Sequence, residues 1–339
     1  MVQSAGGAEG PPLPKQPRRR LTMDPMADVT TGQPTAQRTG AQHAIAAGDY
    51  QATVTQLGAG LRELRHRGHE VITGYAADDL PPAGAGQLLV PWPNRIDHGR
   101  YDFAGHSFQL DLSEPARGNA IHGLTRWATW QLAEQSGEHV ELSLRLLGQP
   151  GYPFCLELRA GYRLTAAAGL EVSITARNAG SEPAPYGTGS HPYLRAGSLV
   201  DECELLLPAA CWQPADDRGI PAGPPQEVTG SPYDFRARRL IGSTSLDHAF
   251  TALASDADGR SWTRLCGPAA EVALWAGPGY GWLQVFTGDP LSPQARRRAL
   301  AVEPMTCPPN AFVSGTDLLT VAPGSSVTHS WGIQATSFS

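Results

Sequence analysis

Residues 139–147, HVELSLRLL, alternate polar and apolar side chains from His139 as far as Leu146. The same alternation recurs in CLELRAGYRL at 155–164 and in LEVSITA at 170–176. A period of two places successive side chains on opposite faces of an extended strand, so each segment has one apolar and one polar face. Strands of this kind are typical of antiparallel sheets, which bury one face and leave the other in water. These three segments therefore decide the fold class, and the sequence predicts an all-β protein.

Further strands are predicted outward from this centre, separated by turn clusters such as SEPAP and GPGYG. They are expected as two strands within 51–74, broken at Gly58–Gly60, and at 204–207, 283–287 and 327–333. No long window has a helical period, and SPQARRRAL at 292–300 is expected to form one or two helical turns at most. Neither a composition break nor a repeat divides residues 43–339. The sequence thus predicts a single domain over 43–339, a large antiparallel β-sandwich.

The bulk composition restricts the function classes. Residues 1–42 are rich in Pro, Gly, Ser, Thr and Gln with few large apolar side chains, and we expect a disordered leader there. The formal net charge of −6 disfavours partners such as nucleic acid or an anionic membrane. No apolar run approaches the roughly 20 residues that cross a bilayer, and we expect no secretory signal, because residues near the N-terminus form no apolar h-region. The five cysteines are odd in number and form no CxxC pair, which favours reduced thiols in the cytoplasm over disulfides or zinc.

Five stretches interrupt the strand pattern by joining turn residues to a polar or titratable side chain. They span 91–105, 119–130, 189–194, 244–250 and 301–312, and they contribute Arg95, His122, His191, Asp247 and Glu303. A sheet can bring such distant residues together at one rim or concave face. In the last stretch, an apolar strand ends on the carboxylate of Glu303, and a buried carboxylate is costly unless it is paired or used. We therefore expect a functional site that includes Glu303.

Each candidate also has a purely structural interpretation. Arg95 could lie on the surface, His122 could close a turn, and Asp247 could form an Asx-turn. His191 could hydrogen-bond its own bend, and Cys307, which has no adjacent base, is expected to be structural. No metal is expected, because the sequence has no HxH or HExxH pattern. Large aromatic rings dominate burial, so the tryptophans near these stretches are expected mainly in the core: Trp92, Trp127, Trp275 and Trp282.

The motifs PWPNRI, HGL, GSHPYL, LDHAF, LQVFTGD and VEPMTCPPNAF, in this order, resemble those of the aldose 1-epimerase (galactose mutarotase) family over about residues 43–335. The EPMTCPPNAF form is similar to a bacterial branch of aldose-1-epimerase-like proteins. The resemblance implies a galactose mutarotase-like supersandwich with an open sugar cleft. It also implies an isomerase that interconverts the α and β anomers of a free aldohexose without metal or organic cofactor.

The resemblance further implies roles for individual residues. The general base matches Glu303 and the general acid matches His191, while the substrate-binding positions match Asn94, Arg95, His122 and Asp247. The base takes a proton from the C1 hydroxyl, the acid protonates the ring oxygen, and the opened ring recloses on the other face. Acid–base groups of this kind contribute about 10²–10⁴-fold each. A histidine near its ordinary pKa of about 6.5 suits an acid that must recover at neutral pH.

Two other functions are compatible with the same motifs. The first is an epimerase for an anionic sugar, such as a hexose 6-phosphate or sulfoquinovose, which would need further cations from among Arg126, Arg195 and Arg236. The second is a non-catalytic carbohydrate-binding protein on the same fold, which the presence of both His191 and Glu303 disfavours. In each case the expected partner is a small sugar, and the protein is expected to be a monomer or homodimer.

Overall fold

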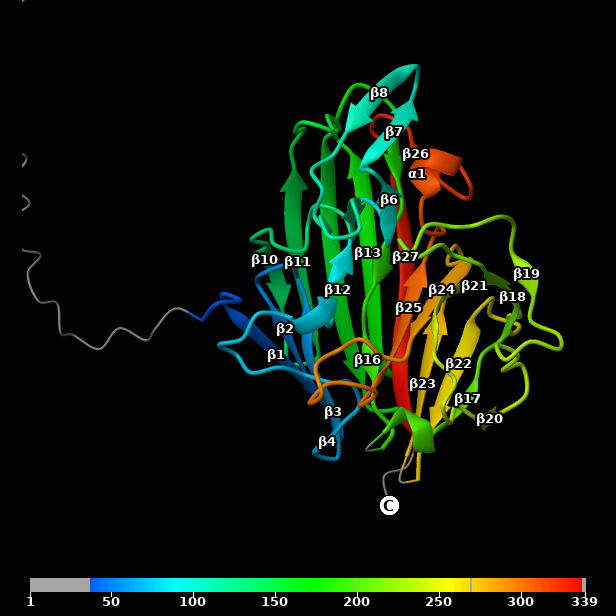
Figure 1. The fold of residues 1–339 in the computed structure, drawn as a ribbon. Helices are drawn as coiled ribbons and strands as arrows, with labels where there is room; N and C mark the ends of the chain where they lie inside the picture. The colour runs from blue at the N-terminus through cyan, green and yellow to red at the C-terminus, as the bar shows by residue number, and fades with distance from the viewer. Residues whose placement is uncertain (1–36, 198, 269, 337–339) are drawn as a thin grey trace, which may run out of the picture. The chain divides into compact units, whose positions relative to one another are not determined.

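Two large antiparallel sheets share one hydrophobic core and make up most of the fold (Figure 1). The computed structural model describes residues 37–336 apart from residues 198 and 269. The leader predicted for residues 1–42 lies outside this range as far as residue 36, and the first strand begins at Gln42. The prediction of an all-β antiparallel sandwich is confirmed.

The first large sheet contains the strands that decided the fold class. Its order is β10-β11-β12-β13-β27-β23-β22-β17-β20. The bounds are Gln131–Gln135 (β10), His139–Leu146 (β11), Leu156–Thr165 (β12), Gly169–Asn178 (β13), Ser326–Thr336 (β27), Glu271–Ala276 (β23), Ser261–Cys266 (β22), Glu204–Leu206 (β17) and Arg239–Leu240 (β20). The three alternating segments are the adjacent strands β11, β12 and β13, with Leu144 opposite Leu158 and Leu158 opposite Ala176.

The second large sheet carries most of the site. Its order is β19-β18-β21-β24-β25-β15-β5, and β16 also pairs with β25. The bounds are Gln226–Glu227 (β19), Ala209–Gln213 (β18), Asp247–Leu253 (β21), Trp282–Phe286 (β24), Leu300–Met305 (β25), Gly189–Ser190 (β15), Tyr193–Leu194 (β16) and Leu88–Leu89 (β5). Every residue of β25 is buried, so both faces of this central strand are covered.

Smaller elements complete the fold. The remaining strands are Gln42–Ala47 (β1), Tyr50–Thr55 (β2), Leu61–His66 (β3), His69–Glu70 (β4), Arg95–Asp97 (β6), Arg100–Phe103 (β7), His106–Gln109 (β8), Asn119–Ile121 (β9), Ala184–Tyr186 (β14) and Leu319–Val321 (β26). Two short 3₁₀ turns cover Pro82–Gly84 and Val200–Glu202, and the single described α-helix is Ala311–Ser314 (α1). No helix within 37–336 is long and apolar enough to cross a membrane.

Of the one or two helical turns expected at 292–300, a single turn forms, in which the amides of Ala295 and Arg296 both donate to the Ser292 carbonyl, and it does not continue as a helix. Arg297 adopts a left-handed backbone conformation (φ 51°), which interrupts a right-handed helix. Its buried guanidinium pairs with Asp201 and Asp289 and also donates to the carbonyl oxygens of Gly242 and Thr244. These tertiary contacts outweigh the weak local helix preference. The four-residue helix α1 was not predicted, because it is too short to show a period.

Successive side chains of β25 point alternately into the hydrophobic core and towards the site. Leu300 and Val302 point into the main core, whereas Ala301 and Met305 belong to small clusters on the other face. Glu303 has the same parity as this second pair and therefore lies on the face away from the core. The strand does not end on Glu303 as the sequence suggested but runs on to Met305.

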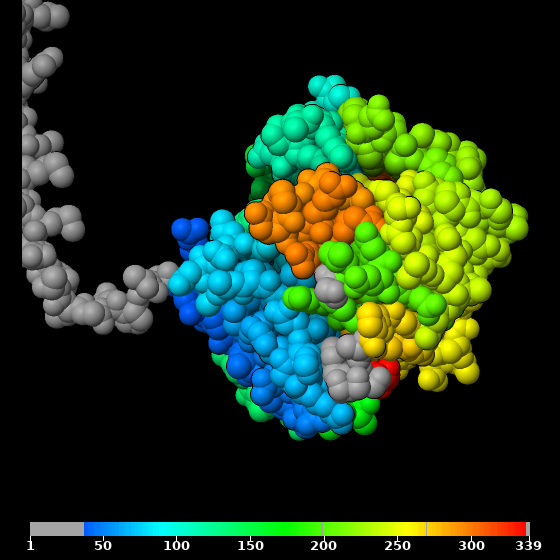
Figure 2. Space-filling model, turned by 60° about the horizontal axis from the view of Figure 1, so that its bottom comes forward, coloured from blue at the N-terminus to red at the C-terminus, as the bar shows by residue number. Residues whose placement is uncertain are grey.

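An apolar cluster supports one wall of the site. Ala85, Tyr193, Ala299 and Ala301 are buried together, with Leu291 packed against them. In the space-filling view the segment near residue 290, in orange, lies between the blue N-terminal strands and the yellow and green segments (Figure 2). Segments far apart in the sequence thus form one continuous surface here.

Candidate active site

His191 and Glu303 face each other because of strand register. Gly189 pairs with Met305 and Tyr193 pairs with Ala301 across β15, β16 and β25, so position 191 lies opposite Glu303. Directly opposed residues in an antiparallel pair bring their side chains together. The ladder is interrupted at this point, and the His191 amide donates to the carbonyl of Gln87 instead. The bend that the sequence showed in GSHPYL thus places the imidazole against the carboxylate.

The two side chains form a buried pair. His191 Nε2 lies 3.3 Å from Glu303 Oε1, and the residues are 5% and 2% exposed. Burial and the nearby charge of Asp247 raise the pKa of Glu303 well above its ordinary value, although Arg95 opposes this. Burial, followed by the charges of Arg126 and Arg95, lowers the pKa of His191 to about 3. The expectation of a histidine near its ordinary pKa is therefore wrong, because desolvation disfavours its charged form.

His122 is fixed in one tautomer. The backbone amide of Asn94 donates to His122 Nδ1 at 3.2 Å, and the His122 amide donates back to the Asn94 carbonyl at 2.9 Å. An amide N–H can only donate, so Nδ1 is the acceptor and Nε2 carries the proton of the neutral ring. Burial and the nearby His191 lower the pKa of His122 well below 6.5. His122 therefore presents a neutral N–H donor, and it does more than close a turn.

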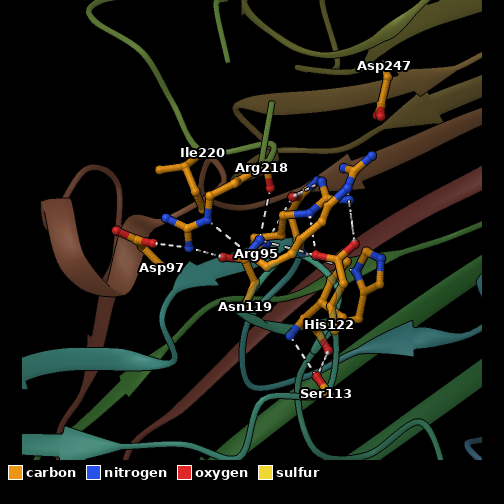
Figure 3. Close-up of polar contacts among 12 residues, drawn as sticks. Arg95, Asp97, Ser113, Asn119, His122, Arg218, Ile220 and Asp247 are labelled. Carbon is orange, nitrogen blue, oxygen red and sulfur yellow. Dashed lines mark hydrogen bonds and ion pairs between the residues drawn. The ribbon is translucent and has the colours of Figure 1, made fainter. Parts of the chain in front are cut away.

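Asn94 is buried, and Arg95 is partly buried rather than on the surface. Asn94 is 3% exposed, and its Oδ1 accepts from the Arg95 amide at 2.9 Å and from Arg95 Nη1 at 3.3 Å. The Arg95 side chain is 12% exposed and forms an ion pair with Glu114. Figure 3 shows Arg95 and His122 close together where strands β6 and β9 pair.

Asp247 is the exposed member of the set, at the first position of β21. Gln284 Nε2 donates to Asp247 Oδ1 at 2.8 Å, so its carboxylate is held by the next strand rather than by an Asx-turn. Gln284 is opposite Glu303 in the β24–β25 ladder and is 4% exposed. Gln284 was not predicted as a site residue, although its place beside apolar neighbours in LQVFTGD was a usable signal.

All six predicted residues line one open cleft of about 390 Å³. Glu114, Arg126, Trp127 and Gln284 line it as well. Trp127 is 52% exposed, contrary to the expectation of a core position. The other three tryptophans are buried as expected: Trp92, Trp275 and Trp282. Cys307 is fully buried, which fits a structural residue, and burial raises its pKa to about 12.

His122, His191 and Glu303 are also the described residues whose spacing suits a metal ion. Their donor atoms lie within 4.8 Å of one another. However, the Asn94 amide occupies the lone pair of His122 Nδ1, and Nε2 carries the proton. In this tautomer His122 offers no free lone pair to a cation, because a ligating imidazole must be neutral and unprotonated at the ligating nitrogen. The donor set therefore suits hydrogen bonding to hydroxyl groups better than metal binding.

Gly84 sets the position of the His191 ring. A Cβ at Gly84 would lie 3.0 Å from His191 Cδ2, and the residue has φ +80°. We expect Gly84→Ala to displace the imidazole by a few tenths of an ångström and to lower any activity of the site several-fold, since a shift near 1 Å costs about 100-fold. Gly68→Ala is the matched control, because Gly68 has φ +78° and open space around it. Turnover and thermal unfolding of both variants check this, and an equal loss of activity in both would refute the contact as the cause.

Comparisons with known proteins agree with this geometry. Residues 42–334 match the family described as aldose 1-epimerase. The chain is 38% identical over 281 residues to the uncharacterized protein YihR of Escherichia coli K12, covering 83% of this chain and 88% of the relative. It is 29% identical over 242 residues to an aldose 1-epimerase of the same bacterium, covering 65% and 66%.

Solved structures show the same fold. A GalM/aldose epimerase homologue from C. elegans superimposes with a TM-score of 0.79 at 19% identity, covering 88% of this chain and 99% of that chain. A galactose 1-epimerase from Lactobacillus acidophilus superimposes with a TM-score of 0.75 at 20% identity, covering 87% and 93%. At these identities the likeness concerns the fold alone.

Proposed function

Because the chain belongs to the aldose 1-epimerase family, we propose that it interconverts the α and β anomers of a free aldohexose by acid–base opening of the ring. The buried His191–Glu303 pair at the cleft, with 3.3 Å between Nε2 and Oε1, carries this proposal. The reacting oxygens of a cyclic aldose, O1 and O5, are bonded to the same carbon. Because O1 and O5 are close together, an acid and a base that are also close together can reach both oxygens at once.

The chemistry follows from one shared proton. Burial raises the pKa of Glu303 and lowers that of His191, so the pair favours holding one proton, which Oε1 and Nε2 at 3.3 Å can share. In the acting state the proton is on His191. Glu303 takes the proton of the O1 hydroxyl, the C1–O5 bond breaks as the C1–O1 double bond forms, and His191 protonates O5. Rotation about C1–C2 and the reverse transfers close the ring on the other face.

The remaining cleft residues hold the sugar. His122 donates through Nε2–H, Arg95 donates through its guanidinium, and the Asp247 carboxylate accepts from hydroxyl groups. Fixed donors and acceptors of this kind convert binding into a defined orientation of C1 over the acid–base pair. Exposed Trp127 supplies an aromatic face at the edge of the cleft.

Polarimetry of freshly dissolved α-glucose and α-galactose tests this proposal. The wild-type protein is expected to speed the approach to the anomeric equilibrium in proportion to its concentration, without changing the final rotation. A final rotation that differs from that of the buffer control would contradict an epimerase at C1. A non-catalytic sugar-binding protein would leave the rate at the buffer value and still bind the sugar, which calorimetry detects.

Arg126 favours a second candidate, an epimerase for an aldose with an anionic substituent. Its guanidinium lines the cleft, donates through Nη2 to the Ile121 carbonyl at 3.3 Å, and has a buried Nε with no described hydrogen-bond partner. No ion pair links Arg126 to a carboxylate among the described residues. Arg126 is partly buried. A cation removed from water without a counter-ion is costly, and a phosphate or sulfonate group on the sugar would provide one. The two other cations considered from sequence are paired elsewhere, Arg195 with Glu70 and Arg236 with Asp234.

The second candidate predicts a charge-selective effect of Arg126→Gln. Loss of a hydrogen-bonded charge should lower kcat/KM for glucose 6-phosphate by about 10–100-fold. The value for glucose should change by less than about twofold, because a neutral sugar leaves this cation unused. Arg126→Lys, which keeps the charge, is the control and should retain part of the activity. Equal losses with both sugars would refute this role of Arg126.

A further inference from the structure

Glu114 forms a two-bond ion pair with one edge of the Arg95 guanidinium. Arg95 Nε donates to Glu114 Oε2 at 2.8 Å and Arg95 Nη2 donates to Oε1 at 3.1 Å. This two-bond contact is the geometry in which arginine and carboxylate match best. It uses Nε and one N–H of Nη2, and one N–H of Nη1 donates to Asn94 Oδ1 at 3.3 Å, so that one N–H on each of Nη1 and Nη2 has no described partner. The Arg95–Glu114 pair is partly shielded from water, with side chains 12% and 22% exposed.

Glu114 is itself held in place. Its amide donates to the Asn119 carbonyl at 2.9 Å, the Asn119 amide donates back at 3.2 Å, and Asn119 Nδ2 donates to Glu114 Oε2 at 3.2 Å. Asn119 begins β9, the strand that pairs with β6 and thereby with Arg95. An isolated bridge to Asn119 thus joins Glu114 to the strand that pairs with the arginine it holds.

A tight turn covers the guanidinium. A Cβ at Gly219 would lie 2.7 Å from Arg95 Nη1 and 2.9 Å from Cζ, so the Gly219 backbone lies directly against this group. Arg218 anchors the turn by donating through Nη2 to Asp97 Oδ1 at 2.5 Å and to Asn119 Oδ1 at 3.0 Å (Figure 3). Asn119 Nδ2 donates in return to the Arg218 carbonyl at 2.9 Å. Arg95 therefore has little freedom to move on this side.

We propose that Glu114 is a positioning residue, which fixes the direction in which Arg95 presents its free N–H groups to the bound sugar. The inference rests on the proposed function, because only a cleft that binds a sugar uses this direction. A guanidinium held in advance loses less rotamer freedom when it forms hydrogen bonds to hydroxyl groups. Glu114 itself need not touch the sugar in this role.

A double-mutant cycle tests the role of Glu114. Glu114→Gln keeps the shape but removes the charge that grips Arg95, and should raise KM by about tenfold while kcat changes less than about twofold, because the lost contact holds substrate and transition state alike. In an Arg95→Gln background the same substitution should change kcat/KM by less than about twofold, because the residues act as a unit. An equal effect of Glu114→Gln in both backgrounds would overturn the proposal.

A matched control separates positioning from general stability. Glu271 on β23 also holds arginines, with Oε1 2.6 Å from Arg264 Nη1 and Oε2 2.6 Å from Arg238 Nη2, and it is similarly exposed. Glu271→Gln should therefore leave KM and kcat unchanged. A KM increase in this variant as large as in Glu114→Gln would overturn the proposal.

A crystal structure of Glu114→Gln gives a readout that does not depend on activity. The Arg95 guanidinium is expected to leave its present position by more than about 1 Å, a shift that is enough to disturb an active site. An unmoved Arg95 would refute positioning by Glu114. If the wild type accelerates no sugar, the proposed function fails, while this structure still decides whether Glu114 holds Arg95.

Discussion

Replacing Glu303 with glutamine is expected to slow mutarotation by about 10²–10⁴-fold while raising the melting temperature. The amide cannot take the O1 proton, but it fills the same space. It also removes a carboxylate that is 2% exposed and whose Oε2 has no described hydrogen-bond partner. Burying such a group costs free energy in the folded state. Loss of activity with gain of stability distinguishes a catalytic carboxylate from a structural one.

The stability gain should depend on pH in a defined direction. Burial raises the pKa of Glu303 in the folded protein above the ordinary value of 4.5, which the unfolded chain retains. As pH rises from about 4.5 towards the pKa of Glu303 in the folded protein, the wild type therefore loses free energy of unfolding. The glutamine variant has no such carboxyl group and does not lose it. The difference in melting temperature should be small near pH 4.5 and larger near neutral pH. A variant that is less stable than the wild type at neutral pH, or that mutarotates at the wild-type rate, would contradict this account of Glu303.

Replacing His191 with asparagine is expected to cause a loss of the same order, about 10²–10⁴-fold, because no acid then reaches the ring oxygen. His329→Asn on β27 is the matched control. His329 is 8% exposed, burial also lowers its pKa, and it lies outside the cleft. Rates measured by polarimetry at equal concentrations of folded protein compare the two variants. Equal rates for His191→Asn and wild type would remove His191 from the mechanism.

The wild-type pH profile separates a shared proton from an independent histidine. A histidine acid with an ordinary pKa of 6.5 would lose activity as pH rises through that value. Burial raises the pKa of Glu303 and lowers that of His191 to about 3, so we expect the pair to share one proton across this range. Activity should therefore stay level through pH 6.5 and fall only at higher pH, when the pair loses its proton. A half-maximal rate near pH 6.5 would contradict the shared proton.

Much of the fold follows from local pattern. The alternation in residues 139–147, 155–164 and 170–176 requires one buried and one polar face, and these segments are neighbouring strands of one sheet. Glu303 was also recognisable, since a carboxylate in an apolar run must be paired or used. The motifs then indicated the other five cleft residues, and the structure brings all six to one cleft.

Other features depend on register and tertiary contact and left no local signal. The 3.3 Å contact between His191 and Glu303 arises from strand pairing across more than a hundred residues. The role of Glu114 depends on a loop that returns to β6, and the lowered pKa of His191 depends on burial that no short window reveals. The exposure of Trp127 differs from the usual burial of large aromatics because it lies at the cleft edge.

The most direct test of the central claim is magnetisation exchange between the α and β anomeric protons of an aldose already at equilibrium, measured by NMR. With wild-type protein, the exchange rate for at least one of glucose, galactose and glucose 6-phosphate should rise in proportion to protein concentration, while the anomer ratio stays constant. With Glu303→Gln or His191→Asn it should fall close to the buffer rate. Exchange at the buffer rate with all three sugars and wild-type protein would contradict anomer interconversion by the His191–Glu303 pair.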